Sequence, residues 1–341
     1  MSGTVAPVTI LGAGSWGTAL AIHLGRLGMC PRLWGRDAVL IKHLEDAHEN
    51  PRYLPGVPVP SGVRATADLR EALADSRIVI VAVPSQFVEE VIETARQAIP
   101  ADAVLVSATK GFEPRRGRRI SVLFSEMLPG NALGVLSGPS FAREVALAQP
   151  TALVIASVDA HVARLLQRAL TAPLFRIYTN RDVIGVEVAG ALKNVMAIAT
   201  GLCDGVGLGE NARAALITRG LAEIVRLGVA LGAQPTTFLG LAGLGDLVLT
   251  CTGSLSRNRA IGREIARGRA LEQAEAATPM IAEGVRTVTS ALTLARDAGV
   301  AMPICREVEA VLFEGKSVRE ALQALLSREP RPEEEGSAIH G

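Results

Sequence analysis

The sequence of 341 residues has few cysteines and no cluster of them. Cys30, Cys203, Cys251 and Cys305 lie far apart, without a CxxC pair and without a histidine at a metal-ligand spacing. Because a disulfide framework or a zinc site needs such clusters, we interpret the four thiols as small buried hydrophobic groups. The sequence therefore predicts a reduced protein with no metal site.

The chain also lacks an excess of charge of either sign and a long apolar run. Its 35 basic and 34 acidic residues leave a formal net charge of +1, which argues against a main function in binding nucleic acid or an anionic membrane. The longest strongly apolar run, Ile78 to Val83, is far shorter than the roughly 18 residues of a membrane span. The N-terminal segment has no basic region typical of a signal peptide. We expect a soluble, cytoplasmic protein of about two domains.

Lysine is scarce: only four of the 35 basic residues are lysines, and the other 31 are arginines. Lysine can release a proton at a usable pH and arginine cannot, so a retained lysine is a candidate for proton chemistry. Lys42 and Lys316 have polar neighbours, whereas Lys110 and Lys193 have small and apolar ones. The last two are therefore the candidates.

Short apolar runs alternate with helical patterns in the first half of the chain. The runs are continuous, as in parallel strands that are covered on both faces. The expected strands are Val8–Leu11, Arg32–Trp34, Ile78–Val83, Ala103–Ser107, Leu133–Leu136 and Ala152–Ala156, and the helices between them include Thr18–Leu27, Phe87–Ala98 and Ala160–Leu170. This alternation predicts an α/β fold, with a Rossmann-type doubly wound sheet over residues 1–180.

After about residue 180 the strand pattern stops, and helical patterns follow one another with Gly or Pro at the joints. The expected helices are Val183–Leu202, Ala212–Leu231, Arg257–Arg267, Ile281–Ala298 and Pro303–Phe313. We therefore predict an all-helical second domain over residues 181–327. The segment 328–341 has two prolines, three consecutive glutamates and almost nothing apolar, which predicts a disordered tail.

A glycine-rich turn follows the first expected strand and opens the first expected helix. It reads Gly12-Ala13-Gly14-Ser15-Trp16-Gly17. The first glycine permits a tight turn, the second lets the backbone approach a pyrophosphate, and the third lets the helix pack on the strand. The pyrophosphate then lies at the helix N-terminus. This context predicts a dinucleotide site.

Polar residues follow several expected strands. Arg36 stands about where an NAD-selective site has an acidic residue, and it suits adenine or a 2′-phosphate, although the adjacent Asp37 leaves the preference between NAD and NADP open. Three further strand ends carry small polar groups or a lysine, in Val81–Gln86, Ser107–Gly111 and Ser137–Ala142. The carboxyl edge of such a sheet is where ligands bind, so we expect these ends to face an anionic substrate.

The helical half contains three segments with candidate chemistry. Lys193 lies in the apolar helix of residues 185–201, where burial should lower its pKa and suit it to proton transfer. Asp246 lies among glycines and leucines and needs a partner cation, for which Lys193 is the natural candidate. Ser256-Arg257-Asn258 follows a Gly-Ser loop and begins a helix, which predicts a phosphate-binding cradle.

Taken together, these motifs resemble one family. GAGSWGTALA, ATKGFE, SGPSFA, GALKNVMAIATG, GLAGLGDLVLTCTG and SLSRNR occur in the order typical of bacterial NAD(P)-dependent glycerol-3-phosphate dehydrogenases, and the resemblance covers roughly residues 5–328. It implies reversible hydride transfer between NAD(P)H and dihydroxyacetone phosphate, giving sn-glycerol 3-phosphate for phospholipid synthesis. One departure is Gly253, where many members of the family have serine.

The resemblance also implies roles for individual residues. Lys193 matches the family's catalytic proton donor and acceptor. The implied cofactor-binding residues are Gly12, Gly14, Ser15, Trp16, Gly17, Arg36, Lys110, Ala142, Arg257, Ile281 and Glu283. The implied substrate-binding residues are Lys110, Gly138, Ser140, Lys193, Asp246, Ser256, Arg257 and Asn258. Separately, the apolar helices of the second domain predict a homodimer.

Two alternatives stay open at this point. A β-hydroxyacid or 6-phosphogluconate-type dehydrogenase would use the same glycine turn and a lysine on a carboxylate substrate. A non-catalytic NADP(H)-binding sensor would bind the nucleotide without turnover, but it would leave Lys193, Asp246 and the Ser256–Asn258 segment without a role.

Overall fold

The computed structural model describes residues 7–277 and 280–329 of the chain, which divides into two units. The first unit comprises Met1–Thr109 and Ile120–Val183, and the second comprises Lys110–Arg119 and Ile184–Gly341. The expected boundary at residue 180 thus falls at Val183, and residues 110–119, which we expected in the first domain, belong to the second unit. Most of the predicted tail, residues 330–341, lies outside the described residues.

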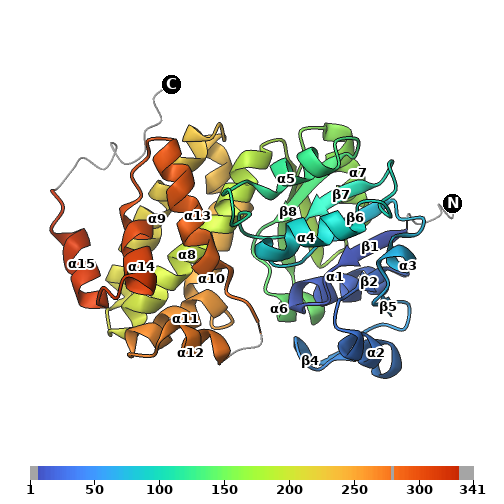
Figure 1. Ribbon diagram of the computed structural model, residues 1–341, viewed down its shortest axis with the longest axis horizontal. Coiled ribbons are helices and arrows are strands. Elements are labelled where there is room, and N and C mark those ends of the chain that lie inside the picture. The colour runs from blue at the N-terminus through green and yellow to red at the C-terminus, as the bar shows by residue number, and fades with distance from the viewer. Residues whose placement is uncertain (1–6, 278–279, 330–341) are drawn as a thin grey trace. The chain divides into compact units, whose positions relative to one another are not determined.

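The first unit is built on an eight-stranded sheet in the order β10-β9-β8-β7-β6-β1-β2-β5 (Figure 1). Its strands are β1 (Val8–Leu11), β2 (Arg32–Trp34), β5 (Arg64–Thr66), β6 (Ile78–Val81), β7 (Val104–Ser107), β8 (Leu133–Ser137), β9 (Thr151–Ala156) and β10 (Phe175–Asn180). Two short strands, β3 (Glu49–Asn50) and β4 (Leu54–Pro58), form a separate antiparallel pair. All six expected strands are present, whereas β3, β4, β5 and β10 were not predicted.

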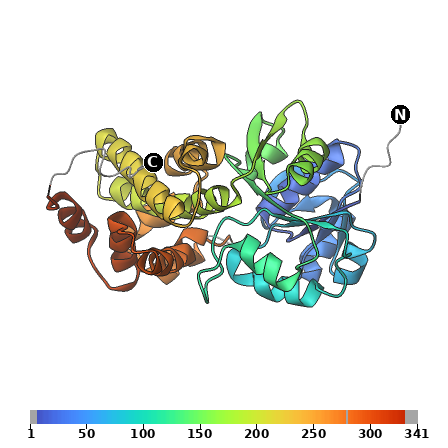
Figure 2. The ribbon, with the colours of Figure 1, turned by 90° about the horizontal axis from the view of Figure 1, so that it is seen from above.

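The sheet is covered on both faces, as the Rossmann-type prediction requires (Figure 2). In β1, Ile10 and Leu11 are adjacent and fully buried, yet they belong to different apolar clusters. One face is covered by α1 (Ser15–Arg26), α2 (Ala38–Ala47), α6 (Ala142–Ala146) and α7 (Ala160–Leu170), and the other by α3 (Leu69–Leu73), α4 (Ser85–Ala95) and α5 (Ile120–Met127). The predicted doubly wound sheet is therefore confirmed.

The strand directions depart from an all-parallel sheet at one place. The β8–β9 pair is antiparallel, whereas β9 and β10 are parallel to each other. Parallel neighbours need a crossover of a dozen or more residues, usually built around a helix that covers the sheet. The connection from β8 to β9 holds only the five-residue α6, which packs against α1, so the chain returns in the opposite direction.

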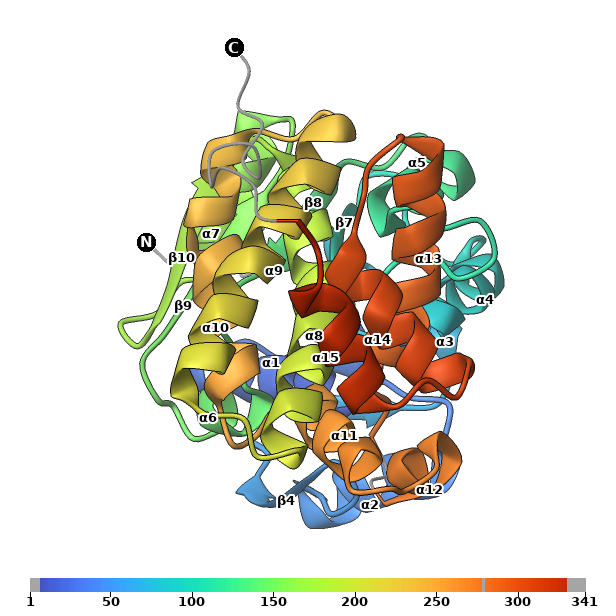
Figure 3. The same ribbon diagram turned by 90° about the vertical axis from the view of Figure 1, so that its left-hand side faces the viewer.

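The helical unit confirms the expected all-α second domain. Its helices are α8 (Val183–Gly205), α9 (Glu210–Ala230), α10 (Asp246–Thr252), α11 (Arg257–Ala266), α12 (Leu271–Ala276), α13 (Glu283–Asp297), α14 (Pro303–Phe313) and α15 (Val318–Leu326). A 3-10 turn over Pro235–Leu239 and a π-helical turn over Leu241–Gly245 precede α10. In Figure 3, α8 runs through the middle of this unit.

Helix α8 is the core element of the helical unit, buried continuously from Gly185 to Leu202. By length and composition α8 is also apolar enough to cross a membrane. Glu187 and Lys193 interrupt its apolar sequence, so α8 contains no long continuous apolar run. However, 89% of its most apolar window is buried inside the protein. A core helix of a soluble protein passes the same test, so α8 gives only weak evidence for a membrane span.

Candidate functional site

The glycine turn between β1 and α1 has the form expected of a pyrophosphate site. Gly12 has a φ of +120°, and a Cβ atom there would lie 2.8 Å from the carbonyl oxygen of Ala82. A Cβ atom on Gly17 would lie 1.8 Å from the carbonyl oxygen of Gly12, whereas one on Gly14 would meet nothing within 4 Å. Within residues 7–277 and 280–329, no side chain caps the N-terminus of α1. The backbone is thus tightly packed at Gly12 and Gly17, where the helix meets the strand, and it leaves space at Gly14, where a ligand would approach.

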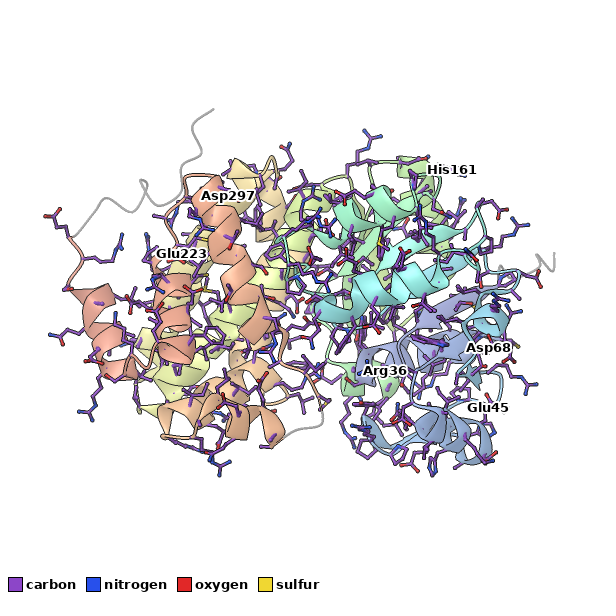
Figure 4. All side chains as sticks on the ribbon, in the orientation of Figure 1. Arg36, Glu45, Asp68, His161, Glu223 and Asp297 are labelled. Carbon is purple, nitrogen blue, oxygen red and sulfur yellow. The ribbon has the colours of Figure 1, made fainter. Side chains whose placement is uncertain are left out.

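Arg36, labelled in Figure 4, follows β2 and is exposed. Its guanidinium lies 4.6 Å from the ring centroid of Phe87 in α4, an aromatic neighbour that the sequence analysis did not identify. The adjacent Asp37 is engaged within the protein. Its carboxylate caps α2 by accepting from the amides of Val39 and Leu40, and it also pairs with Arg52 at 3.2 Å.

The expected polar groups at the ends of β7 and β8 lie on neighbouring strands of the sheet. The hydroxyls of Ser107 and Ser137 are buried and have no hydrogen-bond partner among the described residues. Gly138 has a φ of +129°, Ser140 donates to the Gly138 carbonyl at 3.0 Å, and Ala142 opens α6. The segment containing the proposed substrate residues Gly138 and Ser140 therefore begins at the carboxyl end of β8.

In the helical unit, one buried carboxylate holds two ammonium groups. Asp246, at the start of α10, has no exposed surface. Its Oδ1 accepts from Lys193 Nζ at 2.5 Å, and its Oδ2 accepts from Lys110 Nζ at 2.8 Å. The partnership of Asp246 with Lys193 predicted from the sequence is therefore present, and Lys110 is a second partner.

Thr250, one turn after Asp246, completes this cluster. Its hydroxyl accepts from Lys193 Nζ at 2.8 Å and donates to the Asp246 carbonyl at 2.6 Å. The sequence analysis missed Thr250, although its spacing of four residues from Asp246 places both side chains on one face of α10. Lys193 is thus oriented by the Asp246 carboxylate and by the Thr250 hydroxyl, whose own proton is donated to the Asp246 carbonyl.

The electrostatics of the cluster favour loss of a proton from Lys193. The pKa of Lys193 is lowered to about 7, chiefly by burial. The attraction of Asp246 opposes this change, and the positive charge of Lys110 contributes to it. Near neutral pH, Lys193 therefore exists in both its protonated and its neutral form, which is the property that an acid–base group needs.

The segment predicted to bind phosphate opens α11. Ser256 caps the helix by accepting from the Arg259 amide at 3.3 Å. Burial lowers the pKa of Arg257, and the carboxylate of Glu283, which begins α13, partly offsets that effect. Ile281 precedes Glu283 by two residues and is half-buried. Arg257, Glu283 and Ile281 therefore all belong to the helical unit, as Ser256 and Asn258 do.

Two asparagine amides link the segments that carry these residues. Asn194, next to Lys193, donates to the Lys110 carbonyl at 3.0 Å. Asn258 donates to the Asn194 side-chain oxygen at 3.0 Å and accepts from the Gly284 amide at 3.0 Å. The side-chain oxygen of Asn258 is therefore used inside the protein, and Asn194 is a second polar residue for which the sequence analysis had no role.

Both halves of the chain match models of one family. Residues 7–163 match the N-terminal domain of NAD-dependent glycerol-3-phosphate dehydrogenase, and residues 182–323 match its C-terminal domain. A glycerol-3-phosphate dehydrogenase [NAD(P)+] of Geobacter sp. is 48% identical over 329 residues, covering 96% of this chain and 98% of that protein. The corresponding protein of Stenotrophomonas maltophilia is 47% identical over 334 residues, covering 98% of each.

A solved structure agrees with these relatives. The crystal structure of glycerol-3-phosphate dehydrogenase from Coxiella burnetii is 40% identical and superposes with a TM-score of 0.92. The match covers 95% of this chain and 99% of that one. The chain therefore belongs to the NAD-dependent glycerol-3-phosphate dehydrogenase family.

Proposed function

We propose that this protein reversibly reduces dihydroxyacetone phosphate to sn-glycerol 3-phosphate with NADPH or NADH, and that Lys193 transfers the proton. The observation that carries the proposal is the buried Asp246 carboxylate shared by Lys193 and Lys110. Neither alternative explains it as well. A nucleotide sensor has no use for a buried lysine whose pKa lies near 7, and a simple 3-hydroxy acid leaves the cradle at Arg257 without a phosphate to bind. A 6-phosphogluconate-type activity is disfavoured because both halves of the chain match glycerol-3-phosphate dehydrogenase.

The glycine turn fits the dinucleotide. The open approach at Gly14 and the uncapped N-terminus of α1 suit a pyrophosphate. The proposed cofactor-binding residues of the first unit are Gly12, Gly14, Ser15, Trp16, Gly17, Arg36 and Ala142. Lys110, Arg257, Ile281 and Glu283 remain cofactor-binding predictions that rest on the family resemblance. NAD(P)H supplies a hydride to the substrate carbon when it is bound.

The chain's own residues handle the charge that this transfer creates. A ketone oxygen becomes negative as hydride reaches its carbon, so a proton donor and a fixed cation lower the barrier. Lys193 Nζ gives its proton to that oxygen during reduction and takes it back from the alcohol during oxidation. Lys110 stabilises the developing negative charge, and Asp246 holds both ammonium groups in place.

The substrate phosphate is bound by the start of α11. A guanidinium binds phosphate oxygens with two parallel hydrogen bonds, and the helix N-terminus adds favourable dipoles. Arg257 supplies the guanidinium and Ser256 a hydroxyl in this arrangement. Asn258 contributes by fixing the segment, because its amide already links α8 to α13.

NADPH is the favoured cofactor in this proposal. An NAD-selective site uses a free carboxylate for the adenosine ribose hydroxyls. Asp37 is committed to the cap of α2 and to Arg52, so the exposed Arg36 is left to meet a 2′-phosphate. We further propose a cytoplasmic homodimer that supplies glycerol 3-phosphate to glycerophospholipid synthesis, without nucleic acid or membrane insertion. Exposed apolar side chains of the helical unit, such as Leu239 and Val248, support the dimer.

Initial rates with matched substrates test the proposal. The purified protein should oxidise NADPH with dihydroxyacetone phosphate, and should do so far more slowly with dihydroxyacetone, which lacks the phosphate. It should not oxidise 3-hydroxy acids or 6-phosphogluconate with NADP+. Faster turnover of either acid would establish the alternative dehydrogenase, and nucleotide binding without turnover of any of these substrates would establish a sensor.

A further inference from the structure

Residues 110–119, here called the lysine loop, leave the first unit after β7 and belong to the helical unit. Lys110 is the first residue of this loop, and its ammonium group reaches Asp246. The position of this cation therefore depends on what fixes the loop to the helices. Neither the proton-transfer role of Lys193 nor the phosphate cradle explains the other residues of the loop.

The loop contacts the helical unit at three positions along its length. Phe112 is 1% exposed and packs in the apolar core around α8. Gly117 has a φ of +67° and lies against α13, where a Cβ atom would be 3.4 Å from the Ser290 carbonyl oxygen. At the far end, Arg119 Nη1 lies 2.9 Å from Glu187 Oε2 on α8, and that carboxylate is only 6% exposed.

A buried carboxylate also closes the loop on itself. Glu113 is 1% exposed and accepts from the amides of Arg115 and Arg116 and from Arg118 Nε. The Glu113 amide in turn donates to the Arg118 carbonyl at 2.9 Å. An ordinary surface turn does not need a buried carboxylate to accept from its amides, because water can accept those hydrogen bonds. The internal bonds make the loop a rigid connection between Lys110 and Arg119.

We propose that the lysine loop is a positioning element, in which Glu113 and the Arg119–Glu187 ion pair act through the backbone to hold the Lys110 ammonium group on Asp246. Glu113, Arg119 and Glu187 are positioning residues in this proposal. They serve the proposed dehydrogenase reaction, so the inference rests on the proposed function.

The consequence for the reaction follows from the shared carboxylate. Among the described residues, the charged groups that face Lys193 are Asp246 and Lys110, and the nearby thiol of Cys251 stays neutral because burial raises its pKa to about 12. If Lys110 moves away, Lys193 loses a repelling positive charge, and the Asp246 carboxylate pairs with Lys193 alone. Both changes raise the pKa of Lys193.

The test compares Arg119→Ala with Arg267→Ala, which removes an exposed arginine that pairs with Glu264 in the same unit. The first readout is the pH dependence of kcat/KM for dihydroxyacetone phosphate. Arg119→Ala should move the loss of activity at high pH to higher pH and lower kcat/KM at pH 7 by roughly 10- to 100-fold, the scale of a misplaced catalytic group. Arg267→Ala should behave as the parent does.

The second readout does not require turnover. The chain has only four lysines, so reaction with an amine-directed reagent can be followed at each by peptide mass spectrometry. The side chain of Lys110 is 16% exposed and should react faster in Arg119→Ala, while Lys42 stays as a reference. Arg119→Lys keeps a cation beside Glu187 and should restore most of the parent's behaviour. If Arg119→Ala does not fold, Arg119→Gln, which removes the charge but keeps most of the side chain, takes its place with the same expected results.

A folded Arg119→Ala with an unchanged pH profile and unchanged Lys110 reactivity would overturn the positioning role. If the parent does not reduce dihydroxyacetone phosphate, the proposed function fails, and Lys110 reactivity still decides whether the loop holds this ammonium group. A loss of kcat/KM with no change in pH profile or labelling would show a purely structural effect and would also overturn the proposal.

Discussion

At the scale of the residue, the defining feature is one carboxylate shared by two lysines. Lys193 is buried and Lys110 is partly buried, and the second positive charge beside Lys193 makes it more favourable for Lys193 to release its proton. Burial and Lys110 together hold the pKa of Lys193 near 7. Arginine at position 193 would keep the charge but could not release the proton. This explains why a chain that uses arginine for nearly all its cations has lysine here.

Arg36 gives a prediction at this scale. Arg36→Ala removes the proposed partner of the NADPH 2′-phosphate, and a charge-assisted contact is worth about 1.5–3 kcal/mol, so KM for NADPH should rise by roughly tenfold or more. KM for NADH should change less, since NADH has no 2′-phosphate. Steady-state kinetics with both cofactors measure this difference.

The control for Arg36 is Arg77→Ala, which removes an exposed arginine that pairs with Asp102 in the same unit. It should leave both Michaelis constants unchanged. Equal increases for NADPH and NADH in Arg36→Ala would restrict Arg36 to stacking on adenine and would remove the argument for NADPH preference.

The chemistry of the individual residues predicted only part of the cluster around Asp246. The pairing of Lys193 with Asp246 follows from the cost of burying an unpaired carboxylate, so it was accessible from composition and context alone. Lys110 is 136 positions from Asp246, and nothing local indicates that its loop leaves the sheet unit. Thr250 and Asn194 were missed because hydroxyl and amide groups are common, and only their partners identify them as parts of the site.

At the scale of the element, the start of α11 is fixed by close contact with α8. A Cβ atom on Gly201 of α8 would lie 2.1 Å from the Arg259 carbonyl oxygen, and one on Gly262 of α11 would lie 2.2 Å from the Ile198 carbonyl oxygen. The two backbones therefore touch where they cross. This crossing sets the position of Arg257 relative to Lys193.

Gly201→Ala tests that crossing. Alanine normally stabilises a helix by about 1 kcal/mol relative to glycine. Here the methyl group meets backbone, so the free energy of unfolding should instead fall by about 1–3 kcal/mol, the usual cost of overpacking. KM for dihydroxyacetone phosphate should rise as α11 moves. Urea unfolding and substrate kinetics measure the two effects.

Gly130→Ala is the control, because Gly130 lies in an exposed turn and, among the described residues, a Cβ atom there meets nothing within 4 Å. It should leave the urea midpoint and KM close to those of the parent. A Gly201→Ala variant that is as stable as the parent and has its KM would show that α11 does not depend on this contact.

Helices and strands were predicted correctly where the hydrophobic pattern of a single segment is enough to determine its secondary structure. The continuous apolar runs of β1 and β6 and the long buried pattern of α8 are examples. The antiparallel direction of β9 was not predictable in this way, because it depends on where the intervening α6 packs. The same holds for residues 110–119, whose assignment to the helical unit depends on tertiary contacts of Phe112 and Arg119.

At the scale of the whole molecule, buried titratable groups couple stability to pH. Glu223, labelled in Figure 4, is 2% exposed and accepts from the amides of Ile304 and Cys305 at the start of α14. Burial raises its pKa from 4.5 to about 7, against the opposing hydrogen bonds and the charge of Arg226. The folded state therefore binds a proton more tightly here than the unfolded state.

The sign of the effect follows from this difference. A raised carboxyl pKa contributes stability that is complete below about pH 4.5 and is lost as the pH rises to about 7, amounting to about 3 kcal/mol in total. Glu223→Gln cannot titrate, so it should lack this loss. His23, whose pKa burial lowers, has the opposite effect in both proteins and cancels in the comparison.

Urea unfolding between pH 4.5 and 7.5 measures the difference between the parent and Glu223→Gln. The exposed Glu272→Gln, in the same unit, should follow the parent. If the free energies of unfolding of the parent and Glu223→Gln keep a constant difference across this range, the raised pKa of Glu223 is wrong.

The central claim is that Lys193 moves a proton in a site that Asp246 and Lys110 hold together, and Lys193→Arg tests it most directly. The variant keeps the charge and most of the volume, and the glycine turn that we propose binds the cofactor is untouched. We predict that kcat for dihydroxyacetone phosphate falls by about 10²–10⁴-fold, the usual worth of acid–base catalysis, while the Kd for NADPH stays unchanged. A folded variant with kcat within about threefold of the parent would contradict the claim and assign the proton transfer to Lys110, because general acid–base catalysis is normally worth far more than that.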